Sequence, residues 1–182
     1  ALDVENAGVV GYLRRVASKP VMDADLTLPS PGSEGSLSAA MAALVLDTSV
    51  PYVTTINSTL VDGTYGVGQN IPVLVTFSGR VGVNSTHDGL PYILLNSGGH
   101  AVYTGGNSSS QLAFLYVVGD GDESQHLDID VYAEDVTQTT TIQLNQSVVF
   151  DLATGASAVV TLPKPGTYGS LGENEDIIVD TK

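Results

Sequence analysis

Carboxylates are the side chains that best combine a useful chemical type with a suggestive position. Aspartate oxygens are hard ligands that suit Ca²⁺, and the acidic residues occur mainly in predicted turns and linkers. In a β-sandwich with alternating strand directions, two such turns and the outgoing linker would meet at one pole, where a bound cation would stiffen the joint to the next domain. The predicted ligands are Asp62, Asp120, Asp122 and Asp180, with Asp47 as the equivalent in a preceding domain. The alternative interpretation is that these carboxylates are solvated and keep the protein soluble.

Asn-x-Ser/Thr sequons supply a second candidate chemistry, N-linked glycosylation. They lie at Asn57, Asn84, Asn107 and Asn145, and none has proline at the middle position. Three of the four fall in predicted turn regions, where a glycan can project into solvent. The sequons favour a glycosylated eukaryotic surface protein; the alternative is that a sequence rich in Ser, Thr and Asn forms them by chance.

Catalytic motifs are absent from the sequence. It contains no G-x-S-x-G, no H-E-x-x-H and no P-loop. His87, His100 and His126 have no partner at a metal-ligand or catalytic spacing. The absence of cysteine excludes disulfides, thiolate metal sites and a cysteine nucleophile. We therefore expect the protein not to be an enzyme, although a carboxylate pair assembled in space for glycoside hydrolysis would leave no sequence motif.

The charge balance argues against two classes of partner. The chain has 20 Asp and Glu against 6 Lys and Arg, a formal net charge of −14. Such a charge repels nucleic-acid phosphates and anionic lipids. No apolar run approaches the roughly 20 residues that span a bilayer. We expect neither nucleic-acid binding nor membrane insertion.

An internal repeat defines the organisation of the chain. The segment 27–48, TLPSPGSEGSLSAAMAALVLDT, matches 161–181, TLPKPGTYGSLGENEDIIVDT, with one residue of slippage near the end. A weaker echo sets Leu2-Asp3-Val4 against Leu127-Asp128-Ile129. The period of about 133 residues is long enough for a whole domain per repeat. Residues 1–48 are thus predicted to be the C-terminal strands and linker of a preceding repeat, and 49–182 one complete repeat with its outgoing linker.

Short apolar runs separated by turn signals predict the fold of the complete repeat. Six runs have the length and composition of strands; they cover residues 52–56, 71–77, 91–95, 100–103, 111–118 and 157–162. A seventh, 127–132, alternates apolar Leu127, Ile129 and Val131 with polar residues, as a half-buried strand does. About seven or more strands predict an all-β sandwich.

One segment has conflicting signals. Ser38–Leu46 is rich in Ala, Met and Leu, which favour helix. Its counterpart in the repeat, Glu175–Val179, is β-branched. We therefore interpret Leu44–Leu46 as a strand.

The order of the motifs resembles a known family. The segments Pro51–Thr54, Val61–Gly68, Ile71–Ser78, Leu94–Tyr103 and Phe114–Asp120, followed by Leu162-Pro163 and Val179–Thr181, are similar to the immunoglobulin-like, cadherin-like tandem repeats of giant surface adhesins. The resemblance covers nearly all of residues 49–182 and implies an immunoglobulin-like sandwich. It also implies secretion, end-to-end stringing of repeats, and Ca²⁺ stiffening in some members. The Thr/Gln-rich stretch between Ala133 and Ala156 departs from the family pattern.

These observations predict a structural or adhesive segment of a long extracellular, cell-surface protein that forms a stalk, sheath or filament. Its expected partners are neighbouring repeats or subunits, together with surface glycans or proteins. The alternative is a ligand-binding module that recognises a glycan or protein through the 133–156 insertion. A further alternative, an accessory domain of an enzyme, requires a catalytic domain elsewhere in the protein.

Overall fold

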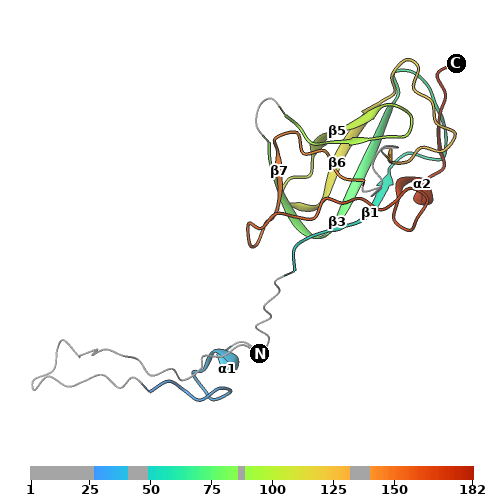
Figure 1. Ribbon diagram of the computed structural model, residues 1–182. Coiled ribbons are helices and arrows are strands. Elements are labelled where there is room, and N and C mark those ends of the chain that lie inside the picture. Colours follow the sequence, from blue (N-terminus) through green and yellow to red (C-terminus); the bar gives the residue numbers. More distant parts are fainter. Residues whose placement is uncertain (1–26, 41–48, 86–88, 132–139) are drawn as a thin grey trace, which may run out of the picture. The chain divides into compact units, whose positions relative to one another are not determined.

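The chain divides into two compact units, residues 1–49 and 50–182 (Figure 1). The computed structural model describes residues 27–40, 49–85, 89–131 and 140–182. The division lies one residue beyond the boundary expected from the repeat, but the origin of the first unit as the tail of another repeat stays a prediction. In that unit the described residues form successive turns followed by one helical turn, α1 (Leu37–Ala40).

The regular elements of the second unit are almost all strands, which confirms the predicted all-β class. Its elements in chain order are β1 (Val53–Ser58), β2 (Gly63–Tyr65), β3 (Asn70–Asn84), β4 (Tyr92–Leu94), β5 (His100–Gly105), β6 (Ser109–Val117), β7 (Val148–Asp151), α2 (Leu171–Asn174) and β8 (Ile177–Val179).

One curled antiparallel sheet dominates this unit. Its strand order is β1-β3-β6-β5-β4, and β7 joins the far end of β3. The long β3 pairs with β1 along Val73–Phe77 and with β7 along Val81–Asn84. β2 and β8 form a separate two-stranded parallel sheet. Because the described strands do not divide into two sheets of comparable size, the immunoglobulin-like topology stays a prediction.

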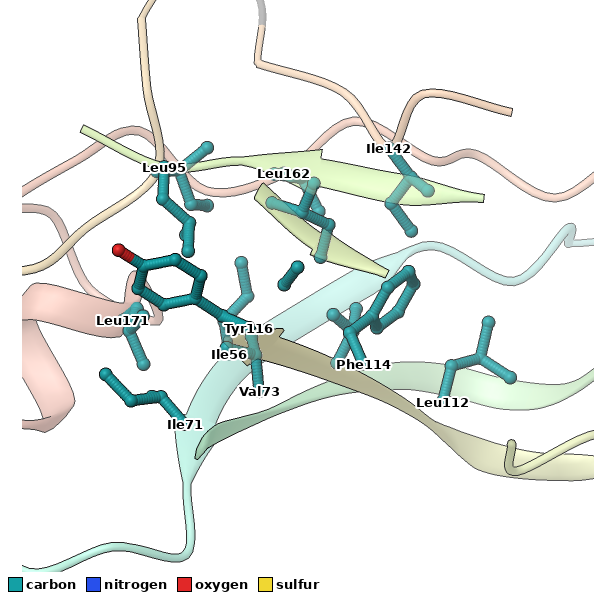
Figure 2. Close-up of a cluster of buried hydrophobic side chains, with 14 of the residues drawn as sticks. Ile56, Ile71, Val73, Leu95, Leu112, Phe114, Tyr116, Ile142, Leu162 and Leu171 are labelled. Carbon is teal, nitrogen blue, oxygen red and sulfur yellow. The ribbon is translucent and has the colours of Figure 1, made fainter. Parts of the chain in front are cut away.

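The core lies on the inner face of the large sheet. Ile71, Val73, Val75 and Phe77 alternate along β3 with half-buried residues, as the two-residue period of a strand requires. The opposite layer combines β8 with irregular segments that contribute core side chains; these are Leu127, Ile129, Ile142, Leu162, Leu171, Ile177 and Val179. Figure 2 shows Leu162 and Leu171 among the side chains of this cluster.

Residues 127–132 differ from the strand that alternation predicts. Ile129 makes only an isolated bridge with Leu95, and the described residues 127–131 form no regular strand. Leu127, Asp128 and Ile129 are all buried, so Asp128 does not face solvent as the alternation predicts, and Asp130 is half-buried. Tyr132 lies outside the described residues.

The structure also bears on the predicted strand 157–162, on the insertion and on the predicted strand Leu44–Leu46. Residues 157–162 pair only through isolated bridges at Ser157, Val159 and Thr161. The insertion supplies β7, which extends the large sheet along β3. At the N-terminal side, the structure has helix at Leu37–Ala40, whereas the predicted strand Leu44–Leu46 lies outside the described residues.

Candidate functional site

The feature with the clearest architectural role is residues 161–174, which we call the closing segment. Its backbone crosses the edge of the large sheet, where Ile56 N–H donates to Gly169 O at 2.8 Å. Asn174 Nδ2 donates to Ile56 O at 2.8 Å and to Thr55 Oγ1 at 3.0 Å. Leu171 is fully buried in the core. The closing segment therefore seals the edge of β1 and completes the layer opposite the sheet.

A short N-capped helix ends the closing segment. Ser170 accepts a hydrogen bond from Glu173 N–H at 3.3 Å through its side chain. Ser170 and Glu173 have the Ser-x-x-Glu spacing of a capping box, although the structure shows only this half of the pair. The cap starts α2 at Leu171 and aims that side chain into the core.

Asp128 holds the closing segment from the other side. This buried carboxylate accepts Ile129 N–H at 2.8 Å through Oδ1 and Gly166 N–H at 2.9 Å through Oδ2. A Cβ at Gly172 would lie 2.8 Å from Asp128 Oδ2, so glycine permits this close approach. Sequence reasoning placed Asp128 on a solvent face and missed its role, because its partner Gly166 is remote in sequence.

The segment 27–40 has the same local structure as the closing segment; we call it the first copy. Each copy runs through the same series of turns and ends in a four-residue helix. Gly32 and Gly35 have φ of 83° and 87°, and Gly166 and Gly169 have 66° and 86°. All four lie in the left-handed region, which favours glycine.

Matching hydrogen bonds hold the two copies in shape. Ser33 Oγ donates to Ser30 O at 2.6 Å, and Thr167 Oγ1 donates to Lys164 O at the same distance. Ala39 N–H donates to Ser36 Oγ at 3.3 Å, as Glu173 N–H does to its own cap. The sequence repeat is therefore also a repeat of backbone geometry.

The chain enters and leaves the second unit at opposite ends (Figure 1). Val53 at the start of β1 pairs with Phe77. Beyond β8, Thr181 Oγ1 donates to Asp122 O at 3.0 Å, in the loop that follows the pairing of Val117 with Asn70. Asn70 begins β3 and Phe77 lies further along it, so the two ends of the unit face in opposite directions.

The predicted metal ligands do not converge in one group. Asp180 and Asp122 lie close to the outgoing chain, whereas Asp62 Oδ1 accepts Asp176 N–H at the opposite end of β8. Asp120 is exposed in its turn, and Asp47 lies outside the described residues. Among the described residues, no three His, Asp or Glu side chains form a group that could hold a metal ion.

Asp122 instead fixes its own loop to the sheet. Tyr116 Oη donates to Asp122 Oδ2 at 2.8 Å, and Gly119 N–H donates to the same oxygen at 2.8 Å. Ser97 Oγ donates to Tyr116 Oη at 2.9 Å. Burial, together with the neighbouring Asp122 carboxylate, raises the pKa of Tyr116 to about 12. These hydrogen bonds hold the loop around Asp122, which contacts the outgoing chain at Thr181, against the core.

This network predicts an alkaline limit to stability. Unfolded tyrosine ionises near pH 10, while folded Tyr116 ionises near pH 12. The unfolded state therefore loses its proton first, and stability is complete below pH 10 and falls as the pH rises toward 12. We expect Tyr116→Phe to lower stability at pH 7 and to flatten this alkaline decline, measured by urea unfolding at pH 7 to 11.5. Tyr168→Phe, at a 91% exposed position, is the control; an equal decline in Tyr116→Phe and wild type would contradict the assignment.

The four sequon asparagines differ in exposure. Asn84, Asn107 and Asn145 are exposed, whereas Asn57 is half-buried within β1. Asn107 Oδ1 accepts Val83 N–H at 2.9 Å, so one face of that side chain is already held. Glycosylation of these asparagines stays a prediction.

A hollow of about 610 Å³ lies outside the core beside β4 and β5. Among the residues that line it are Tyr92, His100, Val102 and Asn145. The rings of Tyr92 and His100 meet edge to face at 5.7 Å between centroids. No buried side-chain nitrogen or oxygen in the described part of the chain lacks a hydrogen-bond partner. The hollow is thus a shallow surface without an unpaired buried group that would demand a ligand.

Comparison with known proteins gives no relative. The chain matches no family model, and no curated protein and no solved structure is similar to it. None of the helices in the described residues is long and apolar enough to cross a membrane.

Proposed function

We propose that this chain is a structural segment of a long extracellular, cell-surface protein, in which domain-sized repeats joined end to end form a stalk, sheath or filament. The observation that carries the proposal is the closing segment, which occurs twice with one backbone geometry. A repeated closing element implies a repeated domain. The expected partners are neighbouring repeats, and the proposal assigns no catalytic activity.

The opposite positions of the two ends support stringing and load transmission. Tension on the chain would pull β1 along its own axis against β3, and β8 along its own axis against the parallel β2. Hydrogen bonds loaded in this direction share the force, whereas strands pulled apart from one end lose their bonds one at a time. The terminal strands of unit 50–182 are therefore arranged to resist stretching.

Exposed sequon asparagines and a net charge of −14 favour a solvated extracellular surface. N-linked glycans and Ca²⁺ remain part of the proposal for different reasons. The glycans rest on the sequons. The cation rests on the acidic turns and linker in the sequence alone, because Asp122 Oδ2 already accepts hydrogen bonds from Tyr116 and Gly119.

Stretching single molecules of the full chain between its termini tests this function. We expect one cooperative rupture with the length gain of releasing residues 50–182, roughly 3.5 Å per residue. Gradual extension without a rupture would contradict a load-bearing role. The same measurement in Ca²⁺ and in chelator tests the role of the cation. A higher rupture force in Ca²⁺ supports Ca²⁺ stiffening, and an equal force would exclude Ca²⁺ from the proposal.

The second candidate function is a ligand-binding module. It is favoured by the hollow beside β4 and β5, because Asn145 brings the insertion to its rim next to the Tyr92 and His100 rings. Aromatic side chains beside a few polar groups are typical of ligand-binding pockets. Saturable binding of a glycan or a protein to a chain that yields at low force would favour this function over the structural one.

A further inference from the structure

The two copies of the closing segment differ in what covers their leucines. Leu162 and Leu171 are 3% and 0% exposed, whereas the equivalent Leu28 and Leu37 are 37% and 46% exposed. Single exposed leucines are common on protein surfaces. Here, however, both exposed leucines occupy positions that are buried in the other copy of the same backbone.

The shared backbone also leaves an open flank beside Gly35. Among the described residues, a Cβ on Gly35 would meet only Pro29 Cγ within 4 Å, at 3.5 Å. A Cβ on Gly169 would meet Pro163 Cγ at the same 3.5 Å, and in addition Thr54 O at 2.7 Å. The internal proline contact is thus present in both copies, whereas within the described residues only the closing segment contacts β1 at this position.

The second copy shows what fits this surface. The closing segment sits on the edge of β1, with Gly169 O accepting Ile56 N–H and Leu171 inserted into the core of the same sandwich. A segment with the same backbone and with leucines at the same two positions suits the same kind of seat: a β1-type strand edge over an apolar core. The second unit already fills its own seat with residues 161–174.

We propose that the first copy, through Leu28, Leu37 and the open flank of Gly35, docks on the β1 edge of a preceding sandwich of the same fold and completes its core. The inference rests on the proposed function only in taking the chain as part of a tandem repeat. The partner is specified by chemistry: a sandwich whose own closing residues are 27–40 of this chain.

The two copies differ in sequence at two positions that make contacts in the closing segment. Ser38 replaces Gly172, which lies against Asp128, and Ala40 replaces Asn174, which bonds to β1. A seat borrowed from unit 50–182 therefore matches the two leucines of the first copy, but in sequence it is matched to glycine and asparagine at the other two positions.

The test supplies the missing seat to the full chain. A copy of residues 50–125 is fused to the amino end of Ala1, so that Leu2-Asp3-Val4 follows it as Leu127-Asp128-Ile129 follows in the second unit. We expect the extended chain to unfold with about twice the calorimetric enthalpy of the original chain, because a second sandwich closes on the first copy. Leu37→Arg is expected to return the enthalpy to the original value in the extended chain, and to leave the melting temperature of the original chain unchanged.

A second pair of variants guards against a failure to fold. One replaces residues 1–26 by residues 50–160, and the other adds Ser38→Gly and Ala40→Asn to match the borrowed seat. If none of these chains gains enthalpy, or if Leu37→Arg leaves the gain intact, the docking proposal is wrong. If the chain extended without a rupture in the stretching experiment, a gain of calorimetric enthalpy in the extended chain would still support docking. The two proposals can therefore fail independently.

Discussion

Leu171→Ala is expected to lower the free energy of unfolding by about 3 kcal/mol. Leu171 is fully buried at the start of α2, and its side chain belongs to the same core cluster as Tyr116 and Ile56 (Figure 2). Removing it leaves a cavity under the closing segment, which collapses only in part because Ser170 and Gly169 are held by their own hydrogen bonds. Urea unfolding of the full chain, followed by circular dichroism, measures the change.

The chain contains a matched control for this substitution. Leu37 occupies the same position in the first copy and is 46% exposed. Leu37→Ala is therefore expected to change the free energy of unfolding by less than about 0.5 kcal/mol. A loss of similar size in both variants would mean that Leu37 is also packed in this chain, and would contradict the difference in seating between the two copies.

Asp128→Ala is expected to cost a similar amount, about 3 kcal/mol, through hydrogen bonding rather than packing. The substitution leaves two N–H groups, those of Ile129 and Gly166, without their acceptor. Hydrogen bonds to a charged group contribute about 1.5–3 kcal/mol each, and an unpaired buried donor adds a desolvation cost. Urea unfolding at pH 7 measures the loss.

Asp128→Asn keeps the shape of the side chain but removes its charge and one of its two acceptor oxygens, so it separates these contributions to the free energy of unfolding. Asparagine keeps one carbonyl acceptor and presents a donor to the other N–H, so we expect a loss intermediate between wild type and Asp128→Ala. Asp120→Ala, at an exposed position, should change the free energy of unfolding by less than about 0.5 kcal/mol. If Asp128→Ala resembled Asp120→Ala, the carboxylate would not hold the closing segment.

Local patterns were sufficient to predict β1, β4, β5, β6 and the first half of β3, but not residues 78–84 of β3 or the short β7. Residues 71–77 of β3 and 112–117 of β6 are nearly continuous apolar runs, and runs of this length bounded by turn residues indicate strands without tertiary context. The repeat was equally visible, because Pro and Gly occupy fixed positions in both copies. The helical turn at Leu171 also has a local signal, the Ser170-x-x-Glu173 spacing, which the strand pattern around it obscured.

The remaining features depend on contacts between distant residues. Alternation around Asp128 predicted a solvent face, but the carboxylate is buried because Gly166 and Ile129 donate to it. The predicted gathering of carboxylates assumed simple alternation of strand directions. The parallel pairing of β2 with β8 places Asp62 and Asp180 at opposite ends of β8.

The most direct test of the structural account compares two directions of pulling on the same molecule. The chain has no cysteine, so Val67→Cys, at an exposed position just after β2, gives a single attachment point. Pulling between residue 67 and the C-terminus peels β8 from β2 from one end, whereas pulling between the termini shears both terminal strands. We predict a rupture force several-fold higher between the termini. Equal forces in the two directions would contradict the claim that this fold is arranged to carry load along a chain of repeats.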